Sequence, residues 1–298
     1  MIPRVAILIL NWNNAPDTIA CLESLGAVDY PACRVLVVDN GSTDGSVAAI
    51  RAAFPEVEIL ETGENLGYAG GNNVGIRYAL ERGAEYVWLL NDDVTVAPES
   101  LSILVAVALS NRDAAFLGPK ICMTEEPQRI LSAGRIGFDG GHRGLGELDR
   151  GQFDQIAEVD HLSGCALLVR REAIERIGML DEDFFAYEED VEWCYRGKRA
   201  GFKVLFVPQA KVWHPDTRRR DPDSPLVTYY MSRNHLLFMK KLDLGTLAIL
   251  RTLGLYVMRV FNWSIRPKWR HKKRQRDALL KAIWDFGRGR YGRAEELS

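Results

Sequence analysis

Residues 87–94, with the sequence VWLLNDDV, decide how the rest of the chain is interpreted. A short apolar run ends here in one amide and two adjacent carboxylates, Asn91, Asp92 and Asp93. The run is typical of a buried strand whose two faces are both covered by helices. Acidic residues that end such a strand lie where open α/β sheets bind their ligands, at the carboxyl ends of the strands.

Two neighbouring carboxylates repel each other unless a positive charge is bound beside them. A hard divalent cation such as Mg²⁺ or Mn²⁺ prefers oxygen ligands and commonly binds together with phosphate groups. The same residues also suit a polar turn after a buried strand, in which Asp93 caps a local backbone group. The spacing alone leaves both interpretations open, and the rest of the sequence has to distinguish them.

The first part of the chain repeats one pattern, an apolar strand followed by a polar turn and a helix. Strands that alternate with helices in this way predict right-handed crossovers and a mainly parallel sheet. The polar turns after the strands should therefore meet at one edge of the sheet. Strands are expected at 5–10, 35–38, 57–60 and 87–90. One helix is expected at 16–25, a second from an N-cap at Ser42 or Thr43 to Ala53, and a third that ends near Arg82.

The chain after these strands adds elements of both kinds. Residues 121–159 break the pattern with glycines and mixed charge, which is typical of a lid or a substrate-binding loop. Further helices are expected at 98–110, at 171–177 and from Glu189, and further strands at 114–119, 166–169, 203–207 and 211–214.

The turn NLGYAGGNNVG at residues 65–75 is rich in glycine. It is not a dinucleotide-binding fingerprint, because it lacks the GxGxxG spacing and follows the third strand instead of the first. Its glycines suit a close approach of the backbone to a nucleotide, or close packing of the following helix on the sheet.

A second acidic segment, DEDFFAYEEDVEW at residues 181–193, leads into a helix. Carboxylates in the first turn of a helix are stabilised by its dipole, so a solvated helix start explains Glu188 and Glu192 without any site. His214 closes an apolar strand just before Pro215, and a lone histidine in that position is either structural or a ligand.

The composition is that of an intracellular globular protein. The 298 residues, 47% of them hydrophobic, suffice for a sizeable core. Five scattered cysteines without a CxxC pair indicate reduced thiols and a cytosolic protein with no disulfide framework or zinc site. No signal peptide is visible, and no apolar run reaches the roughly 18 residues that span a bilayer.

The charge of the chain is divided unevenly. Residues 1–210 carry a net −14, whereas residues 211–298 carry +12, with 20 Lys and Arg against 8 Asp and Glu. Residues 244–263 have apolar side chains at helical spacing, and residues 266–276 are strongly basic, with Trp263, Trp269 and Trp284 in and around them. Such a segment suits the surface of an anionic membrane. The alternative is a helical appendage that packs on the body or on a second subunit, while nucleic-acid binding lacks a supporting motif.

Taken in order along the chain, these motifs resemble those of inverting glycosyltransferases of family 2. Each motif alone is weak, but their ordered combination over residues 4–240 is specific, and it is most similar to rhamnosyltransferase-like members that build bacterial surface polysaccharides. The resemblance rests on LNWN (10–13), VVDNGSTDG (37–45), NLGYAGGNNVG (65–75), LLNDDV (89–94), SGCALLVRR (163–171), FFAYEEDVEWCYR (184–196), AGFKV (200–204), His214 and YYMSRN (229–234).

This resemblance implies an α/β protein of the GT-A fold, a Rossmann-like, mainly parallel sheet with flanking helices, over residues 1–240. A helical basic tail would follow over residues 241–298. The resemblance also implies a metal-dependent transferase in which Asp93 and His214 bind Mg²⁺ or Mn²⁺ and Asp92 contributes less. Asn91 stands where the family's DxD motif has its first acid.

The resemblance further implies roles for single residues. Asp39 matches the acid that reads the nucleotide base, and a carboxylate can accept the ring N–H of uracil or thymine. Asp190 matches the catalytic base of the family's Glu-Asp pair. The other residues expected to bind the nucleotide are Asn11, Asn13, Gly67, Asn72 and Asn91, and those expected to bind the acceptor are Tyr187, Glu189 and Trp193.

The reaction implied is the transfer of a sugar such as rhamnose from a dTDP- or UDP-sugar to a hydroxyl of a glycan or lipid-linked acceptor, in cell-surface polysaccharide synthesis. The enzyme would be cytoplasmic and peripheral at the inner face of the cell membrane, with a homodimer as a further expectation. Two other functions stay open. A sugar nucleotidyltransferase needs a phosphate loop with Lys or Arg after the first strand, which residues 11–14 lack. A non-catalytic nucleotide-sugar binder would have lost Asp93 or Asp190, and both are present.

Overall fold

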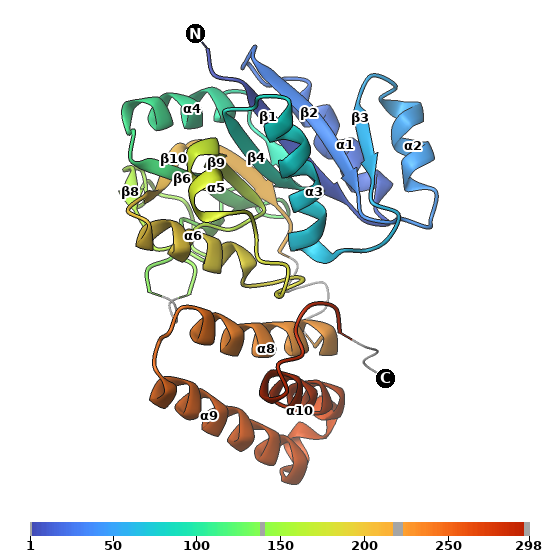
Figure 1. Cartoon of the computed structure of the whole chain (residues 1–298), viewed down its shortest axis with the longest axis vertical. Coiled ribbons are helices and arrows are strands. Elements are labelled where there is room, and N and C mark those ends of the chain that lie inside the picture. The colour runs from blue at the N-terminus through green and yellow to red at the C-terminus, as the bar shows by residue number, and fades with distance from the viewer. Residues whose placement is uncertain (1, 138–140, 217–222, 295–298) are drawn as a thin grey trace. The chain divides into compact units, whose positions relative to one another are not determined.

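The computed structural model describes residues 2–137, 141–216 and 223–294 (Figure 1). The chain divides into two compact units. One, here called the sheet unit, comprises Met1–Leu180 and Trp193–Asp216, and the other, the helical unit, comprises Asp181–Glu192 and Thr217–Ser298. The boundary therefore differs from the one expected at residue 240, and the acidic segment belongs with the C-terminal helices.

The described part of the sheet unit contains one ten-stranded sheet, in which the order of strands is β3-β2-β1-β4-β9-β6-β10-β5, with β7 beside β6 and β8 beside β10. Strands β3, β2, β1 and β4 are mutually parallel, as are β6 and β10, whereas β9 runs antiparallel to both of its neighbours. The strands are β1 (Val5–Asn11), β2 (Cys33–Asp39), β3 (Glu58–Glu61), β4 (Tyr86–Asn91), β5 (Thr95–Val96), β6 (Ala114–Met123), β7 (Ile130–Ser132), β8 (Ala157–Glu158), β9 (Ala166–Arg170) and β10 (Lys203–His214).

Helices cover both faces of this sheet (Figure 1). Alternate residues of β1 enter two separate cores, because successive side chains of a strand point to opposite faces. Ile7 and Ile9 pack with residues of α1, α2 and α4, and Leu8 packs with residues of α3, α5 and α6. The helices are α1 (Ala15–Leu25), α2 (Ser46–Ala53), α3 (Gly67–Glu81), α4 (Ser100–Ser110), α5 (Arg171–Ile177) and α6 (Glu189–Arg199).

The glycine-rich turn serves helix packing. A Cβ atom on Gly71 would lie 2.5 Å from Cδ1 of Leu10, and one on Gly75 would lie 2.8 Å from Cγ2 of Val38. Both contacts are shorter than real carbon contacts, so only glycine lets α3 approach the sheet this closely. The packing interpretation of these glycines is confirmed.

Two local expectations were wrong. Helix α2 begins at Ser46 with Gly45 at the N-cap position, because the Ser42 hydroxyl is used elsewhere and accepts from Nδ2 of Asn11 and from the backbone N–H of Asn13. The two strands expected between residues 203 and 214 form one strand, β10, whose register against β6 shifts between Val207 and Lys211. Residues 121–159 carry only short strands, and 138–140 lie outside the described residues.

The helical unit consists of the segment 181–192 and the helices α8 (Pro225–Lys241), α9 (Thr246–Ile265), the 3₁₀ helix η1 (Pro267–Lys272) and α10 (Lys273–Gly287). Helices α8 and α10 pack through a small core that includes Tyr229, Tyr230, Ala278 and Ala282. Helix α9 has no fully buried residue. Among the described helices, none combines the length and apolar content needed to cross a bilayer.

Candidate functional site

The polar residues that end β1, β2 and β4 lie side by side. Asn11 is opposite Asp39 in the register of β1 and β2, and Leu10 is opposite Asn91 in the register of β1 and β4. The expectation that these turns meet at one edge of the sheet is confirmed.

Asp39 is held by its neighbours in a fixed orientation. Its Oδ1 accepts from Nδ2 of Asn11 at 2.7 Å, and its Oδ2 accepts from the backbone N–H of Ser42 at 3.0 Å. Asn11 is itself fixed, because its Oδ1 accepts from the hydroxyl of Thr18 at 2.9 Å. Asp39 is only 2% exposed. Asn11 thus supports Asp39. The sequence alone does not distinguish this supporting role from direct contact with a ligand.

The turn after β1 presents two exposed residues. Asn13 has a φ of 52° and accepts from the backbone N–H of Thr43 at 2.8 Å through its Oδ1, which joins the turns after β1 and β2. Trp12, which was not among the predicted site residues, exposes 52% of its surface. An exposed ring beside a site of polar side chains offers a stacking surface.

The turn before α3 is fixed by Asn40. Its Nδ2 donates to the carbonyl oxygen of Gly67 at 3.1 Å, and its Oδ1 accepts from the backbone N–H of Leu66 at 3.0 Å. Gly67 has a φ of 75°, which favours glycine. Asn72 is buried and donates to the carbonyl oxygen of Tyr68 at 2.9 Å, within α3.

The acid pair after β4 meets the end of β10. Nε2 of His214 lies 3.1 Å from Oδ1 of Asp93 and 3.2 Å from Nδ2 of Asn91. Oδ2 of Asp92 accepts from Nδ2 of Asn14 at 3.0 Å. Burial, with the nearby charge of Asp93 as the second cause, raises the pKa of Asp92 to about 7. Two of the expected metal ligands, Asp93 and His214, are therefore in contact, while the side chain of Asp92 bonds Asn14, which is an additional member of the site.

These residues fit a hard divalent cation. The donors are carboxylate oxygens, which Mg²⁺ and Mn²⁺ prefer, and an imidazole nitrogen. Within residues 2–137, 141–216 and 223–294 there is no group of three or more His, Cys, Asp and Glu side chains set to hold a metal ion. Mg²⁺ commonly binds through one or two protein carboxylates together with substrate phosphates and water, so a smaller protein ligand set is compatible with it.

The acidic segment of the helical unit contains the predicted base. Oδ1 of Asp190 accepts from the backbone N–H of Val191 at 2.8 Å. Glu189 is 5% exposed, and burial, followed by the charge of Asp190, raises its pKa well above its usual range. The two adjacent acids therefore have different environments, and Glu189 holds its proton more tightly than an exposed glutamate. Tyr187, expected to bind the acceptor, is exposed.

Trp193 has a different place from the one expected. It is fully buried in the sheet unit, donates to the carbonyl oxygen of Gly178 at 2.9 Å and packs edge-on against Phe116 with ring centroids 5.4 Å apart. A side chain with its N–H satisfied and its ring enclosed has no surface left for an acceptor. We therefore assign Trp193 to the packing of α6 instead of to acceptor binding.

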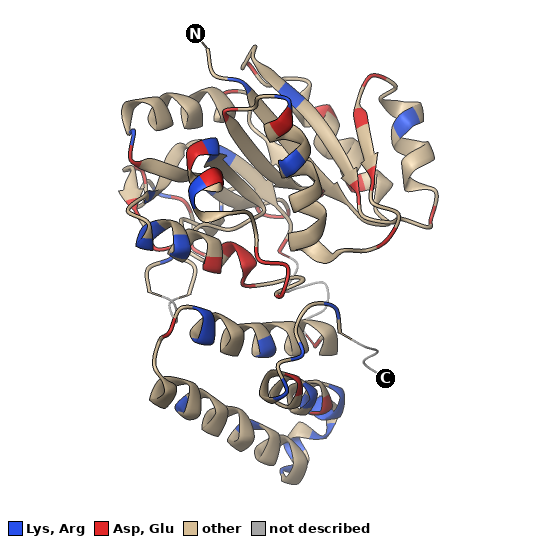
Figure 2. Cartoon of the chain, in the orientation of Figure 1, with Lys and Arg blue, Asp and Glu red and all other residues tan. Residues whose placement is uncertain are grey.

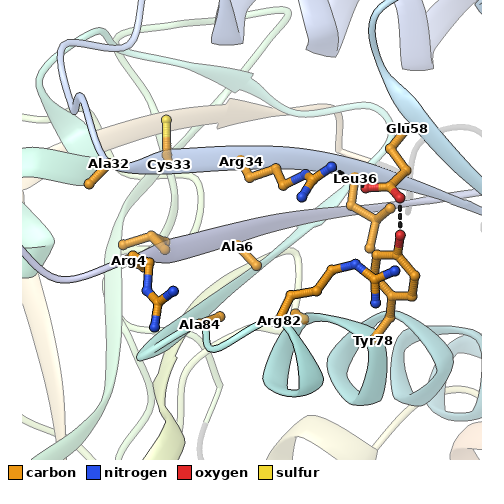
Figure 3. Close-up of a pocket in the computed structure, with 12 residues that line it drawn as sticks. Arg4, Ala6, Ala32, Cys33, Arg34, Leu36, Glu58, Tyr78, Arg82 and Ala84 are labelled. Carbon is orange, nitrogen blue, oxygen red and sulfur yellow. Dashed lines mark hydrogen bonds and ion pairs between the residues drawn. The ribbon is translucent and has the colours of Figure 1, made fainter.

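A cavity of about 360 Å³ lies at the opposite edge of the sheet, where β1 and β2 begin (Figure 3). Arg34 pairs there with Glu58 at 3.1 Å, and the Tyr78 hydroxyl donates to the same carboxylate. The guanidinium of Arg82 lies over the Tyr78 ring. The cavity contains none of the acids that end the strands. The candidate site is therefore the group of polar and acidic residues at the other edge of the sheet.

Comparison with known families gives an independent finding. The family profile described as "Glycosyl transferase family 2" matches residues 6–178, more than half of the chain. The N-acetylglucosaminyl-diphospho-decaprenol L-rhamnosyltransferase of Mycobacterium tuberculosis is 33% identical over 258 residues, which are 78% of this chain and 82% of that protein.

Two further relatives are similar over most of the chain. A hexosyltransferase of low-salt glycan biosynthesis from Haloferax volcanii is 29% identical over 205 residues, 68% of this chain and 64% of that protein. The chain thus spans slightly less than two thirds of that relative. A dTDP-rhamnosyl transferase of Shigella flexneri is 29% identical over 217 residues, 70% of this chain and 71% of that protein.

Among solved structures, the mannosyltransferase of Pyrobaculum calidifontis, determined in complex with GDP-Man and Mn²⁺, is similar with a TM-score of 0.62. The sequences are 16% identical, and the match covers 96% of this chain and 87% of that one. At this identity the likeness shows the fold. The α/β fold of the GT-A type, with a mostly parallel sheet and flanking helices, is the one predicted from the sequence.

Proposed function

The chain belongs to glycosyl transferase family 2, and from this we propose that it is a metal-dependent, inverting transferase that moves a sugar from a nucleotide-diphosphate sugar to an acceptor hydroxyl. The observation that carries the proposal is the acid pair after β4, with His214 at 3.1 Å from Asp93, at the same sheet edge as the buried carboxylate of Asp39. Acids on neighbouring strand ends suit a ligand that has a base at one end and phosphates at the other.

Asp93, His214 and, more weakly, Asp92 would hold Mg²⁺ or Mn²⁺. The cation would neutralise the diphosphate as it leaves. The high pKa of Asp92 supports this assignment, because an adjacent positive charge favours the ionised form of both acids. The mannosyltransferase of similar fold was determined with Mn²⁺.

Asp39 would read the nucleotide base. Its carboxylate is fixed by Asn11 and Ser42, so it can accept a further hydrogen bond from a ring N–H without losing side-chain freedom on binding. Uracil and thymine carry such an N–H, which favours a UDP- or dTDP-sugar. The relative from Shigella flexneri is named for dTDP-rhamnosyl transfer, which supports a dTDP-sugar such as dTDP-rhamnose as the first donor to test.

Asp190 would take the proton of the acceptor hydroxyl, which attacks the anomeric carbon from the face opposite the diphosphate. Its carboxylate accepts from the N–H of Val191 at the start of α6, which holds the side chain in place. Burial raises the pKa of Glu189, which favours its protonated form and makes it the weaker candidate for the base. Tyr187 is exposed beside them and would contact the acceptor.

The helical unit would keep the enzyme at an anionic membrane, where a lipid-linked acceptor is located. Helix α9 exposes an apolar face, and η1 and α10 add a cluster of Lys and Arg (Figure 2). An exposed apolar helix face bordered by basic residues suits the interface of an anionic bilayer. The apolar side chains are Leu247, Leu250, Val257, Met258, Phe261 and Ile265.

The relative from Mycobacterium tuberculosis is named for an acceptor on a diphospho-decaprenol carrier, which supports a lipid-linked acceptor in cell-surface polysaccharide synthesis. The enzyme would then work at the inner face of the cell membrane. A homodimer that buries the apolar face of α9 is the alternative occupant, and light scattering with and without vesicles separates the two.

A two-step experiment tests the proposed reaction. UDP-, dTDP- and GDP-sugars are screened for thermal stabilisation with Mn²⁺, Mg²⁺ or EDTA, since a ligand that binds only the folded state raises the melting temperature. The preferred donor is then incubated with lipid-linked and soluble glycans, and the released nucleotide is identified. A transferase releases the nucleoside diphosphate. Release of pyrophosphate from a nucleoside triphosphate would identify a nucleotidyltransferase, and stabilisation without turnover on any acceptor would indicate a binding protein.

A further inference from the structure

The segment before α6 has an unusual backbone. Phe185, Tyr187 and Glu188 have φ angles of 64°, 69° and 73°, in the left-handed region that non-glycine residues rarely adopt. Conformations of this kind are strained and persist only where the surrounding structure holds them. Here they immediately precede the two acids Glu189 and Asp190.

The side chain of Asn234, on α8, holds this segment. Its Nδ2, which carries two hydrogens, lies within hydrogen-bond distance of three carbonyl oxygens, those of Phe184 at 2.8 Å, Ala186 at 2.7 Å and Tyr187 at 2.8 Å. Asn234 is 0% exposed, so no water replaces these bonds. Three carbonyl groups within four residues converge on one amide, and this is possible only because the backbone between them turns into the left-handed region.

Arg233 fixes the orientation of that amide. Its Nε and Nη2 donate to Oδ1 of Asn234 at 3.0 and 2.8 Å, so that Nδ2 is the atom that faces the segment. The same guanidinium donates to the carbonyl oxygens of Phe184 at 3.0 Å and Gly292 at 2.7 Å. Arg233 is 1% exposed. A buried guanidinium that donates to several fixed acceptors at once gives a rigid support.

Side chains of the segment add to this support. The ring of Phe185 stacks on Tyr230 with centroids 5.4 Å apart and an angle of 16° between the planes. Nζ of Lys241 lies 2.6 Å from Oδ2 of Asp183. The carbonyl oxygen of Asp183 also accepts from the backbone N–H of Gly292 at 2.7 Å. All of these contacts lie within the helical unit.

We propose that Asn234 and Arg233 are positioning residues for the transfer reaction, because they fix the segment 184–187 and thereby the start of α6 from which Asp190 projects. Asp190 lies three residues after the anchored carbonyl of Tyr187. The intervening Glu188 accepts the first bond of the helix, from the N–H of Glu192 at 2.9 Å. A shift of the anchor therefore moves the base. This inference rests on the proposed function, in which Asp190 takes the acceptor proton.

The substitution Asn234→Asp tests the proposal with almost no change in size. A carboxylate would face three carbonyl oxygens and would repel them, while its other oxygen keeps the contact with Arg233. We expect kcat with a saturating acceptor to fall about 100-fold, the loss that a misplacement near 1 Å produces. The donor Kd should change less than twofold, because the donor residues belong to the sheet unit. Arg233→Lys should give a smaller loss of the same kind, since it removes the fork that orients the amide.

The matched control is Asn111→Asp. Nδ2 of Asn111 also donates to a backbone carbonyl, that of Val107 at 2.9 Å, but at the end of α4 in the sheet unit. A double variant, in which Glu188→Gly is combined with Asn234→Asp, adds a second readout. Glycine adopts a positive φ without support, so Glu188→Gly should reduce the loss of kcat caused by Asn234→Asp.

Hydrogen exchange tests the same inference without any turnover. Asn234→Asp should speed exchange of the amides of residues 184–192 at least tenfold, and Asn111→Asp should leave it unchanged. Two results would overturn the positioning role and leave the proposed function intact. One is equal exchange in Asn234→Asp and the wild type. The other is a native kcat in Asn234→Asp and Arg233→Lys while Asp190→Asn is inactive. Absence of turnover in the wild type with every donor and acceptor would count against the proposed function, and exchange would still decide the role of Asn234.

Discussion

Nε2 of His214 lies 3.1 Å from Oδ1 of Asp93, so the last residue of β10 meets the second acid after β4. The two residues are far apart in the sequence, and between their strands in the sheet lie β9 and β6. Their meeting depends on the long reach of β10, which continues past its register shift to His214. The sheet order thereby brings an imidazole to a pair of acids.

Removal of Asp93 should abolish metal-dependent donor binding. In Asp93→Ala the Mn²⁺-dependent rise in melting temperature with a nucleotide sugar should disappear, and His214→Ala should reduce it. Asp113→Ala, which removes an exposed acid that pairs with Lys203, serves as the control and should behave as the wild type. Unchanged donor affinity of the wild type in saturating EDTA would show that no metal is involved.

Asp39 should set the preference for the base. We expect the wild type to bind UDP or dTDP more tightly than GDP, as measured by calorimetry. Asp39→Ala should weaken binding of the preferred nucleotide by about 10- to 100-fold, the range for a hydrogen bond to a charged group. A preference for GDP over both pyrimidine nucleotides would contradict the assignment.

Asp190 should be essential for turnover and dispensable for donor binding. Asp190→Asn keeps the shape and removes the proton acceptor, so kcat should fall by about 10²–10⁴-fold with the donor Kd nearly unchanged. Glu189→Gln should be tolerated better, because burial raises the pKa of Glu189 and so favours the protonated form that glutamine resembles. If Asp190→Asn turns over normally and Glu189→Gln does not, the two roles are reversed.

The apolar face of α9 should determine membrane binding. Phe261→Asp and Met258→Asp each place a charge on this exposed face and should reduce flotation with anionic vesicles. Leu226→Asp, at an exposed leucine of α8, is the control. Truncation of the tail is a poorer test, because Ala278 and Ala282 of α10 belong to the core shared with α8. Equal recovery on neutral and anionic vesicles would rule out the electrostatic part of the proposal.

His161 should make the protein sensitive to acid. It is 1% exposed, and burial lowers its pKa to about 3 from 6.5. The unfolded chain binds a proton below pH 6.5 that the folded chain does not bind, so stability is lost as the pH falls from 6.5 towards 3. At pH 5 this loss is about 2 kcal/mol.

The substitution His161→Phe tests this sensitivity. Its free energy of unfolding, from urea titrations, should fall less between pH 7 and pH 5 than that of the wild type. His271→Gln, at an exposed histidine, should follow the wild-type pH dependence. Parallel pH profiles for the wild type and His161→Phe would show that the folded protein accepts a proton at His161.

The sheet was predictable where the sequence contains a repeated local signal. The apolar runs before Asn11, Asp39 and Asn91 each end in a polar turn, and this pattern gave both the parallel strands and the edge of the site. The antiparallel direction of β9 was not predictable, because an apolar run at 166–170 has the same composition in either direction. The single strand β10 was missed because its register shift looks in sequence like a break.

The site was predictable where a residue type has one dominant use. Asp93 and His214, which the motifs pair as ligands, are in contact, and Asp92 bonds Asn14 beside them. Trp193 was assigned to the acceptor because an aromatic residue near acids suits both a pocket and a core. The role of Asn234 was not predictable, because its amide bonds to backbone carbonyls, which leave no pattern in the sequence.

The cavity at the start of β1 and β2 has a practical consequence. Cys33 lines it and is half-buried, whereas Cys21, Cys122, Cys165 and Cys194 are all buried. A small maleimide dye should therefore label Cys33 before the other thiols, at alkaline pH because burial raises the pKa of this thiol. The native chain thus offers an attachment site for a fluorescent dye, at the edge of the sheet away from the acids. Titrations with nucleotides and metal ions could be followed through that dye.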